Sequence, residues 1–79
     1  ANRLNQGWVD VLAEIVETGI EEGSFDCDDA EDAAWMIMSL LDGLAIQVTV
    51  RGGVGPRRVR RLVRAGVEEQ LGLPSGTLR

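Results

Sequence analysis

The chain has 79 residues, enough for one small domain, and its 44% hydrophobic and 27% charged content is typical of a globular protein. A net charge of −5 disfavours nucleic acid or an acidic membrane surface as its main partner. The sequence contains no His and no Lys, and all eight basic residues are arginine. The usual general bases and Schiff-base nucleophiles are therefore missing, so we predict that the chain is not an enzyme and has no catalytic residues.

A domain of this size buries only about 60% of its unfolded surface, so it usually needs a disulfide, a metal or a partner. Cys27 is the single cysteine, which excludes an internal disulfide and fits a reducing cytoplasm. The acids around it do not match a calcium loop, because Ala30 and Glu31 stand where that loop needs an oxygen ligand and a glycine. We therefore expect no metal and no other cofactor, and we expect oligomerisation to supply the missing stability.

Cys27 is also a poor candidate nucleophile. It lies between Asp26 and Asp28, whose negative charges disfavour the thiolate. Reactive thiols are found in electropositive surroundings instead.

The first predicted helix covers about residues 4–22. Apolar side chains recur on one half of its surface, and acids occupy the other half. Gly23 and Ser24 predict its end. We expect Phe25 to fold back from the following loop onto the core.

The second predicted helix covers about residues 29–50, with Asp28 as its N-cap and Glu31 completing a capping box. Its main apolar stripe is continuous, yet the opposite side is also apolar in part. A helix that is apolar on both sides is buried on both sides, and one neighbouring helix covers only one of them. The sequence therefore predicts a second contact from outside this chain. The apolar side chains on the opposite side are Trp35, Met36, Ile46 and Val50.

The same segment is the longest apolar stretch of the chain. Ser39, Asp42 and Gln47 interrupt it, and an aspartate near the centre of a bilayer costs about 2.5–3.5 kcal/mol. A buried helix of a soluble protein is the better interpretation. The first residues lack the apolar core of a signal peptide, and the chain starts close to a helix. We interpret it as a piece of a longer protein.

The third predicted helix covers about residues 56–71, with Pro56 in the first turn and Gly72 as the stop, and residues 74–79 form a tail. Gly43 and Gly66 lie in the middle of helices, where glycine costs about 1 kcal/mol relative to alanine. This cost suggests close approaches between helices at both positions.

The charge is divided unevenly along the chain. Residues 1–50 hold eleven acids and one arginine, a net charge of −10, whereas residues 51–79 hold seven arginines and two glutamates, a net charge of +5. The acidic part and the arginine-rich third helix either attract one another, within a chain or between chains, or form two separately solvated surfaces. Direct binding of nucleic acid is disfavoured, because the arginine run has no aromatic residues beside it.

Four segments in order carry a family resemblance. They are VLAEIVETGIEEGSF at 11–25, DDAEDAA at 28–34, LLDGLAIQ at 40–47 and EEQLGL at 68–73. The ordered set resembles the C-terminal half of TetR/AcrR-type transcriptional regulators over about residues 8–73. In that family an N-terminal helix-turn-helix binds operator DNA, and a helical C-terminal domain holds an effector pocket. The resemblance implies that this chain lacks the DNA-binding head.

The resemblance also implies an all-α fold, in which the last two helices pair with those of a second subunit in a four-helix bundle. One side of the second helix would then face its own core and pocket, and the other side would face the partner. The predicted dimer interface is Leu40, Leu41, Leu44, Val48, Val59, Leu62, Val63, Gly66 and Val67. The candidate effector-pocket residues, for which plain core packing is the alternative, are Trp8, Leu12, Trp35 and Met38.

The resemblance therefore implies the dimerisation and effector-sensing part of a bacterial, cytoplasmic TetR-like repressor with a small apolar effector. The alternative is a stand-alone helical homodimeric interaction module that has no effector. In either case this piece alone should bind neither DNA nor a membrane.

Overall fold

The structure, a computed structural model, describes the backbone of residues 2–78 and the side chains of residues 6–50 and 52–78. The helices are α1 (Asn2–Glu21), α2 (Ala30–Ile46) and α3 (Pro56–Leu71), with a short π-helical turn η1 (Gln47–Arg51) after α2. No strand occurs within residues 2–78. The all-α prediction is confirmed.

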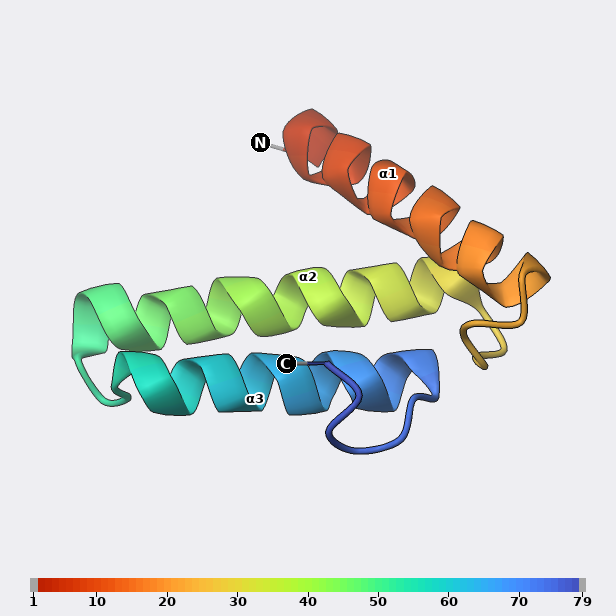
Figure 1. The fold of residues 1–79 in the computed structure, drawn as a ribbon. Coiled ribbons are helices and arrows are strands. Elements are labelled where there is room, and N and C mark those ends of the chain that lie inside the picture. The colour runs from red at the N-terminus through yellow and green to blue at the C-terminus, as the bar shows by residue number, and fades with distance from the viewer. Residues whose placement is uncertain (1, 79) are drawn as a thin grey trace.

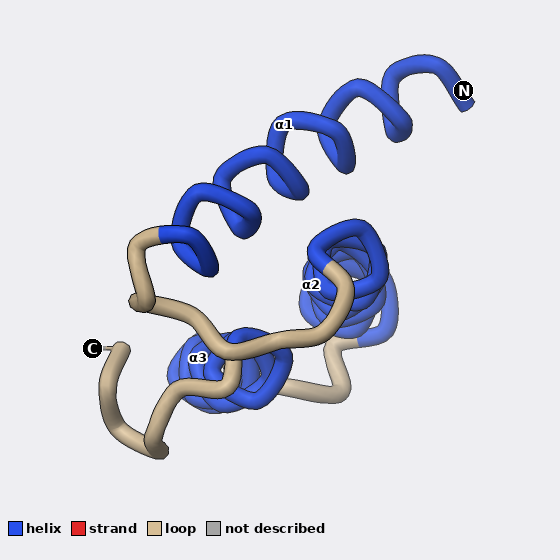
Figure 2. Tube along the Cα trace, turned by 90° about the vertical axis from the view of Figure 1, so that its right-hand side faces the viewer, coloured by secondary structure: helices blue, strands red, loops and turns tan. Residues whose placement is uncertain are grey.

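Helices α2 and α3 run antiparallel and side by side, and α1 crosses α2 obliquely (Figure 1). Seen from the end of the α2–α3 pair, α1 passes over one side only (Figure 2). The molecule is a flat slab with extents of 39 × 33 × 15 Å. The other side of the α2–α3 pair is therefore not covered by a helix of this chain.

Glycines end α1 and α3 in the same way. Gly23 and Gly72 have positive φ angles of 81° and 67°. After α1, Ser24 N–H donates to the Gly19 carbonyl at 2.8 Å; after α3, Leu73 N–H donates to the Glu68 carbonyl at 2.9 Å. Both are Schellman motifs, which satisfy the last free carbonyls of a helix and favour glycine at the left-handed position.

The N-cap of α2 is Asp29, so the prediction of Asp28 was wrong by one residue. Asp29 has an extended backbone, and its carboxylate accepts a hydrogen bond from Asp32 N–H at 3.0 Å. A run of two aspartates offers two possible caps, and only the backbone geometry selects the one that precedes the first helical residue. Glu31 therefore lies within the first turn and does not complete a capping box.

The second helix is α-helical for a shorter distance than the predicted 29–50. It widens at Gln47 into η1 and ends where Gly52 adopts a φ of 64°. The Thr49 hydroxyl donates to the Ala45 carbonyl at 2.7 Å, a bond of the kind that weakens and bends the last helical turns. Val48, Thr49 and Val50 are also β-branched and have low helix propensity.

The core is small. Its buried apolar residues include only valines, alanines, Ile37 and Leu71, and the largest completely buried side chains are Val9 and Val16. Phe25 packs against this core, as predicted, and its ring covers Gly19. Leu73, which follows α3, also packs against the core. The core lies where α1, the start of α2 and the end of α3 meet.

The isolated chain exposes more surface than a chain of its size normally does. Its accessible surface is 5817 Å², whereas a folded monomer of 8.5 kDa is expected to expose about 4,700 Å². Its radius of gyration is 13.2 Å, against about 12 Å for a compact domain of this length. The flat shape leaves roughly 1,100 Å² more surface in contact with water than expected.

Candidate interaction surface

The uncovered side of α2 carries an apolar stripe, which we call the outer stripe. Trp35, Met36 and Ile46 of α2 form it together with Val50 of η1, and all four are exposed. At 100° per residue, Trp35 and Ile46 lie opposite the part of α2 that packs in the core, and Met36 lies to one side of it. The packed positions are Ala30, Ala33, Ala34 and Ile37.

Two glycines show the difference between the two sides of the α2–α3 pair. A Cβ at Gly66 on α3 would collide with the side chain of Leu40, so this glycine lets α2 and α3 approach closely within the chain. A Cβ at Gly43 would meet nothing within 4 Å. Gly43 lies at the outer stripe. The close approach predicted at Gly66 is present, whereas no contact within the chain accounts for Gly43.

The chain itself already uses some of the predicted interface residues. Leu40 packs against Gly66, and Val67 packs against the core. Leu41 is exposed. Leu44, Val48, Val59, Leu62 and Val63 are half-buried. The interface itself stays a prediction.

The apolar side chains of the outer stripe can be recognised in the sequence, but the predicted dimer interface did not include Met36, Ile46 and Val50. The available signal was their position on the nominally polar side of the second helix, where apolar side chains need another explanation.

The four candidate pocket residues lie on two helices. Leu12 of α1 packs against the core, and Met38 of α2 is half-buried. Trp8 and Trp35 are 59% and 42% exposed. The two surface hollows described below are lined by other residues, so effector binding at these four positions stays a prediction.

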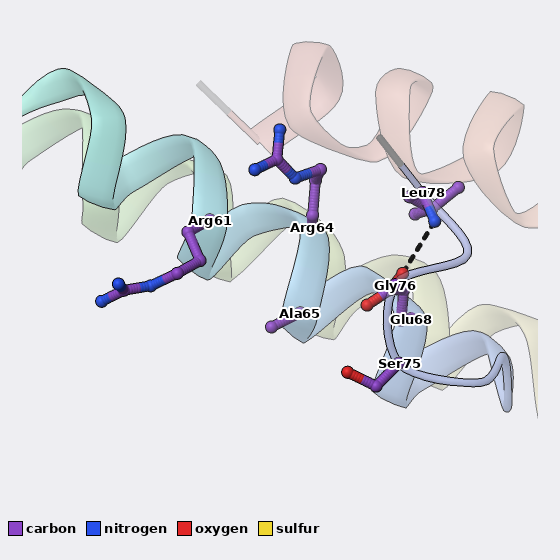
Figure 3. A pocket seen from close by; sticks show the side chains of 7 residues that line it. All are labelled: Arg61, Arg64, Ala65, Glu68, Ser75, Gly76 and Leu78. Carbon is purple, nitrogen blue, oxygen red and sulfur yellow. Dashed lines mark hydrogen bonds between the residues drawn. The ribbon is translucent and has the colours of Figure 1, made fainter.

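Both hollows lie along α3. One has a volume of about 620 Å³ and is lined by Gly55, Pro56, Arg57, Arg58, Arg61 and Arg64. The other, of about 410 Å³, lies between α3 and the C-terminal tail and is also lined by Arg61 and Arg64 (Figure 3). Ala65, Glu68, Ser75, Gly76 and Leu78 complete its wall. Both are open and bordered by arginine, which suits an anionic partner better than an apolar one.

Glu68 is a buried charged residue at the edge of the second hollow, and its carboxylate accepts a hydrogen bond from Leu78 N–H at 2.7 Å (Figure 3). Glu68 therefore holds the returning C-terminal tail on α3. A hydrogen bond from a backbone N–H partly offsets the cost of burying its carboxylate.

Cys27 is half-buried and packs against the core. Burial, followed by the charges of Asp28, Asp26 and Asp29, raises the pKa of this thiol above its ordinary value. A raised pKa lowers the thiolate fraction at neutral pH, which agrees with the unreactive cysteine expected from the sequence. Within the described side chains, no three His, Cys, Asp or Glu residues gather closely enough to hold a metal ion.

By length and composition alone, the helical segment Ala30–Val50 could cross a membrane. Core helices of soluble proteins meet the same criterion, so the result carries no argument for a membrane.

A family model described as BetI-type transcriptional repressor, C-terminal, matches residues 1–72. The chain belongs to this family. The match contains all three helices of this TetR-type C-terminal domain and ends at Gly72, so the tail that covers Glu68 lies beyond it. Neither the curated proteins nor the solved structures give a significant match.

Proposed function

We propose that this TetR-type C-terminal domain is the dimerisation and effector-sensing part of a bacterial, cytoplasmic transcriptional repressor, and that it is not an enzyme. The family places the chain in a regulator. We assign DNA reading to another part of that regulator, a helix-turn-helix of the kind that the resembled family carries.

Two observations support the dimer: the chain exposes more total surface than a compact monomer, and large apolar side chains lie on that surface. The chain exposes roughly 1,100 Å² more than a compact monomer, and each partner in a standard interface buries about 800 Å². Among the described side chains, eight large apolar ones are exposed, and four of them form the outer stripe on α2 and η1. A second copy laid against the open side of the α2–α3 pair would cover that stripe in a four-helix bundle.

The outer stripe on α2 and the half-buried Val59 and Leu62 on α3 form the proposed interface. Gly43 lies within it and permits a close crossing of two helices. Leu40 and Gly66 contribute from within each subunit by fixing the spacing between α2 and α3. Coverage by protein also explains why α2 is apolar over a membrane-like length while containing Asp32 and Asp42.

The proposed mechanism is a population shift. A small apolar effector would bind near Trp8, Leu12 and Met38, with Trp35 at the border between this site and the dimer face; both tryptophans are partly exposed. If its affinity differs between two arrangements of the helices, it changes the spacing of the two DNA-reading heads of the dimer. The small core under α1 allows such a rearrangement, because few large side chains hold α1 in place.

Sedimentation equilibrium of the 79-residue chain tests the dimer. We expect a dimer at low micromolar concentration and a shift towards monomer for Ile46→Asp, because a charge in the outer stripe would be buried without a partner. Val11→Asp is the matched control: it introduces the same charge at an exposed valine on α1, and it should leave the dimer intact. A wild-type monomer at high micromolar concentration would overturn the proposal.

A further inference from the structure

Helix α1 carries a ridge of acids, which we call the acidic ridge. Asp10, Glu14, Glu17 and Glu21 recur at intervals of four and three residues, and all four are exposed. This spacing places them on one side of the helix. The only side-chain hydrogen bond formed by their carboxylates within the described side chains joins Asp10 to Gln6 at 2.8 Å, one turn away on α1.

Helix α3 carries the complementary feature, an arginine ridge. Arg57, Arg61 and Arg64 recur at the same intervals of four and three residues, and all three line the hollow of about 620 Å³. Arg57 and Arg61 are exposed, and Arg64 is half-buried. None of the side-chain hydrogen bonds within residues 6–50 and 52–78 involves an arginine.

The two ridges match in sign, spacing and length. Asp10 to Glu17 and Arg57 to Arg64 each span seven residues, which is about 10.5 Å along a helix. Helices laid side by side in this register would bring three carboxylates to three guanidinium groups. Within one chain they do not meet, because α1 and α3 each pack on α2.

We propose that the arginine ridge of one copy receives the acidic ridge of a second copy, in a contact separate from the apolar dimer face. The charge complementarity is contained in this one sequence, whose residues 1–50 carry a net charge of −10 and whose residues 51–79 carry +5. The occupant is therefore another chain of the same kind. The two patches differ, so the contact is head-to-tail and extends assembly beyond a pair.

The contact is weak and sensitive to salt. An exposed ion pair changes an association constant by up to about fivefold. The Debye length falls from about 30 Å at 0.01 M salt to about 3 Å at 1 M. The ridges therefore associate chains at low ionic strength and release them at high ionic strength, whereas the apolar dimer face persists in both conditions.

Sedimentation velocity of the full chain at about 0.02 M and about 0.5 M NaCl tests the contact, because the Debye length differs several-fold between them. We expect species larger than a dimer at low salt only. Arg61→Glu and Glu14→Arg should each weaken this association about tenfold, since each replaces an attraction with a repulsion. The double variant, Glu14→Arg with Arg61→Glu, should restore it.

Arg60→Glu is the matched control, because it changes the charge of α3 equally at an exposed arginine that lines neither hollow. It should retain the large species. Absence of large species at low salt, or failure of the double variant to restore them, overturns the contact. Binding of the arginine ridge to a short DNA duplex at about 0.15 M salt would also overturn it. None of these outcomes affects the proposed function as long as the dimer itself persists at high salt.

Discussion

Both sides of α2 carry apolar side chains, but the two sides have different surroundings. The inner side packs Ala33, Ala34 and Ile37 against α1 and α3, with Leu40 inserted at Gly66. The outer side carries larger apolar groups, Trp35, Met36 and Ile46, which are 42–55% exposed. Small residues allow the helices of one chain to approach closely, while these bulky residues stay about half exposed. The difference indicates that the chain packs only half of its apolar helix by itself.

The largest expected effect contrasts two neighbours on α2. Ile37→Ala should destabilise the chain by about 2–5 kcal/mol, because it leaves a cavity in the core. Met36→Ala removes a side chain that is exposed within one chain. Urea unfolding over a range of protein concentrations separates the two. Ile37→Ala should lower the midpoint at every concentration, and Met36→Ala only where the dimer forms. Equal effects of both at all concentrations would remove the distinction between the two sides.

The two mid-helix glycines extend the comparison. Gly66→Ala should destabilise the chain by up to about 2 kcal/mol, because displacing Leu40 costs about 1–3 kcal/mol and helix propensity returns about 1 kcal/mol. Gly43→Ala should stabilise the monomer by about 1 kcal/mol through helix propensity, since its Cβ meets nothing within the chain. Thermal unfolding at low concentration measures both. If Gly43 lies at the crossing of two subunits, this gain should shrink or reverse as the concentration rises.

A smaller effect concerns the tail beyond the family match. Glu68→Ala should cost about 1 kcal/mol and release residues 73–78, because Leu78 N–H loses its acceptor. Glu69→Ala, at the exposed neighbouring position, should have little effect. Hydrogen exchange at the Leu78 amide is the measurement. Equal protection in both variants would show that the tail is held by other contacts.

The smallest effect is chemical. Burial and the neighbouring aspartates raise the pKa of the Cys27 thiol, so less thiolate is present at neutral pH than in an unfolded peptide. Iodoacetamide should therefore modify the folded chain more slowly than a peptide of residues 24–31, and the rise in rate with pH should be displaced to higher pH. Asp28→Asn in the folded chain, compared with the unchanged peptide, should narrow the difference in rate. A folded chain that reacts faster than the peptide would contradict this assignment.

The three helices were predictable because their signals are local. Pro56 and Gly72 mark the ends of α3, and Gly23 marks the end of α1, since each requires only the conformation of its own backbone. The errors are also local. Either of two adjacent aspartates could cap α2, and the sequence did not distinguish them. At the other end, the β-branched run does not simply end the helix: from Gln47 the hydrogen bonds change from the α-helical to the π-helical pattern.

The sequence by itself determined the all-α class and the family, because periodicity and ordered motifs are properties of the chain. It also predicts a cover on both sides of the second helix. Tertiary structure alone decided which side of α2 is packed, that Leu40 fills the space at Gly66, and that the buried Glu68 holds the tail. Those outcomes depend on where residues distant in sequence meet. A helical pattern gives the direction in which a side chain points around the helix axis, but it does not say which residue that side chain contacts.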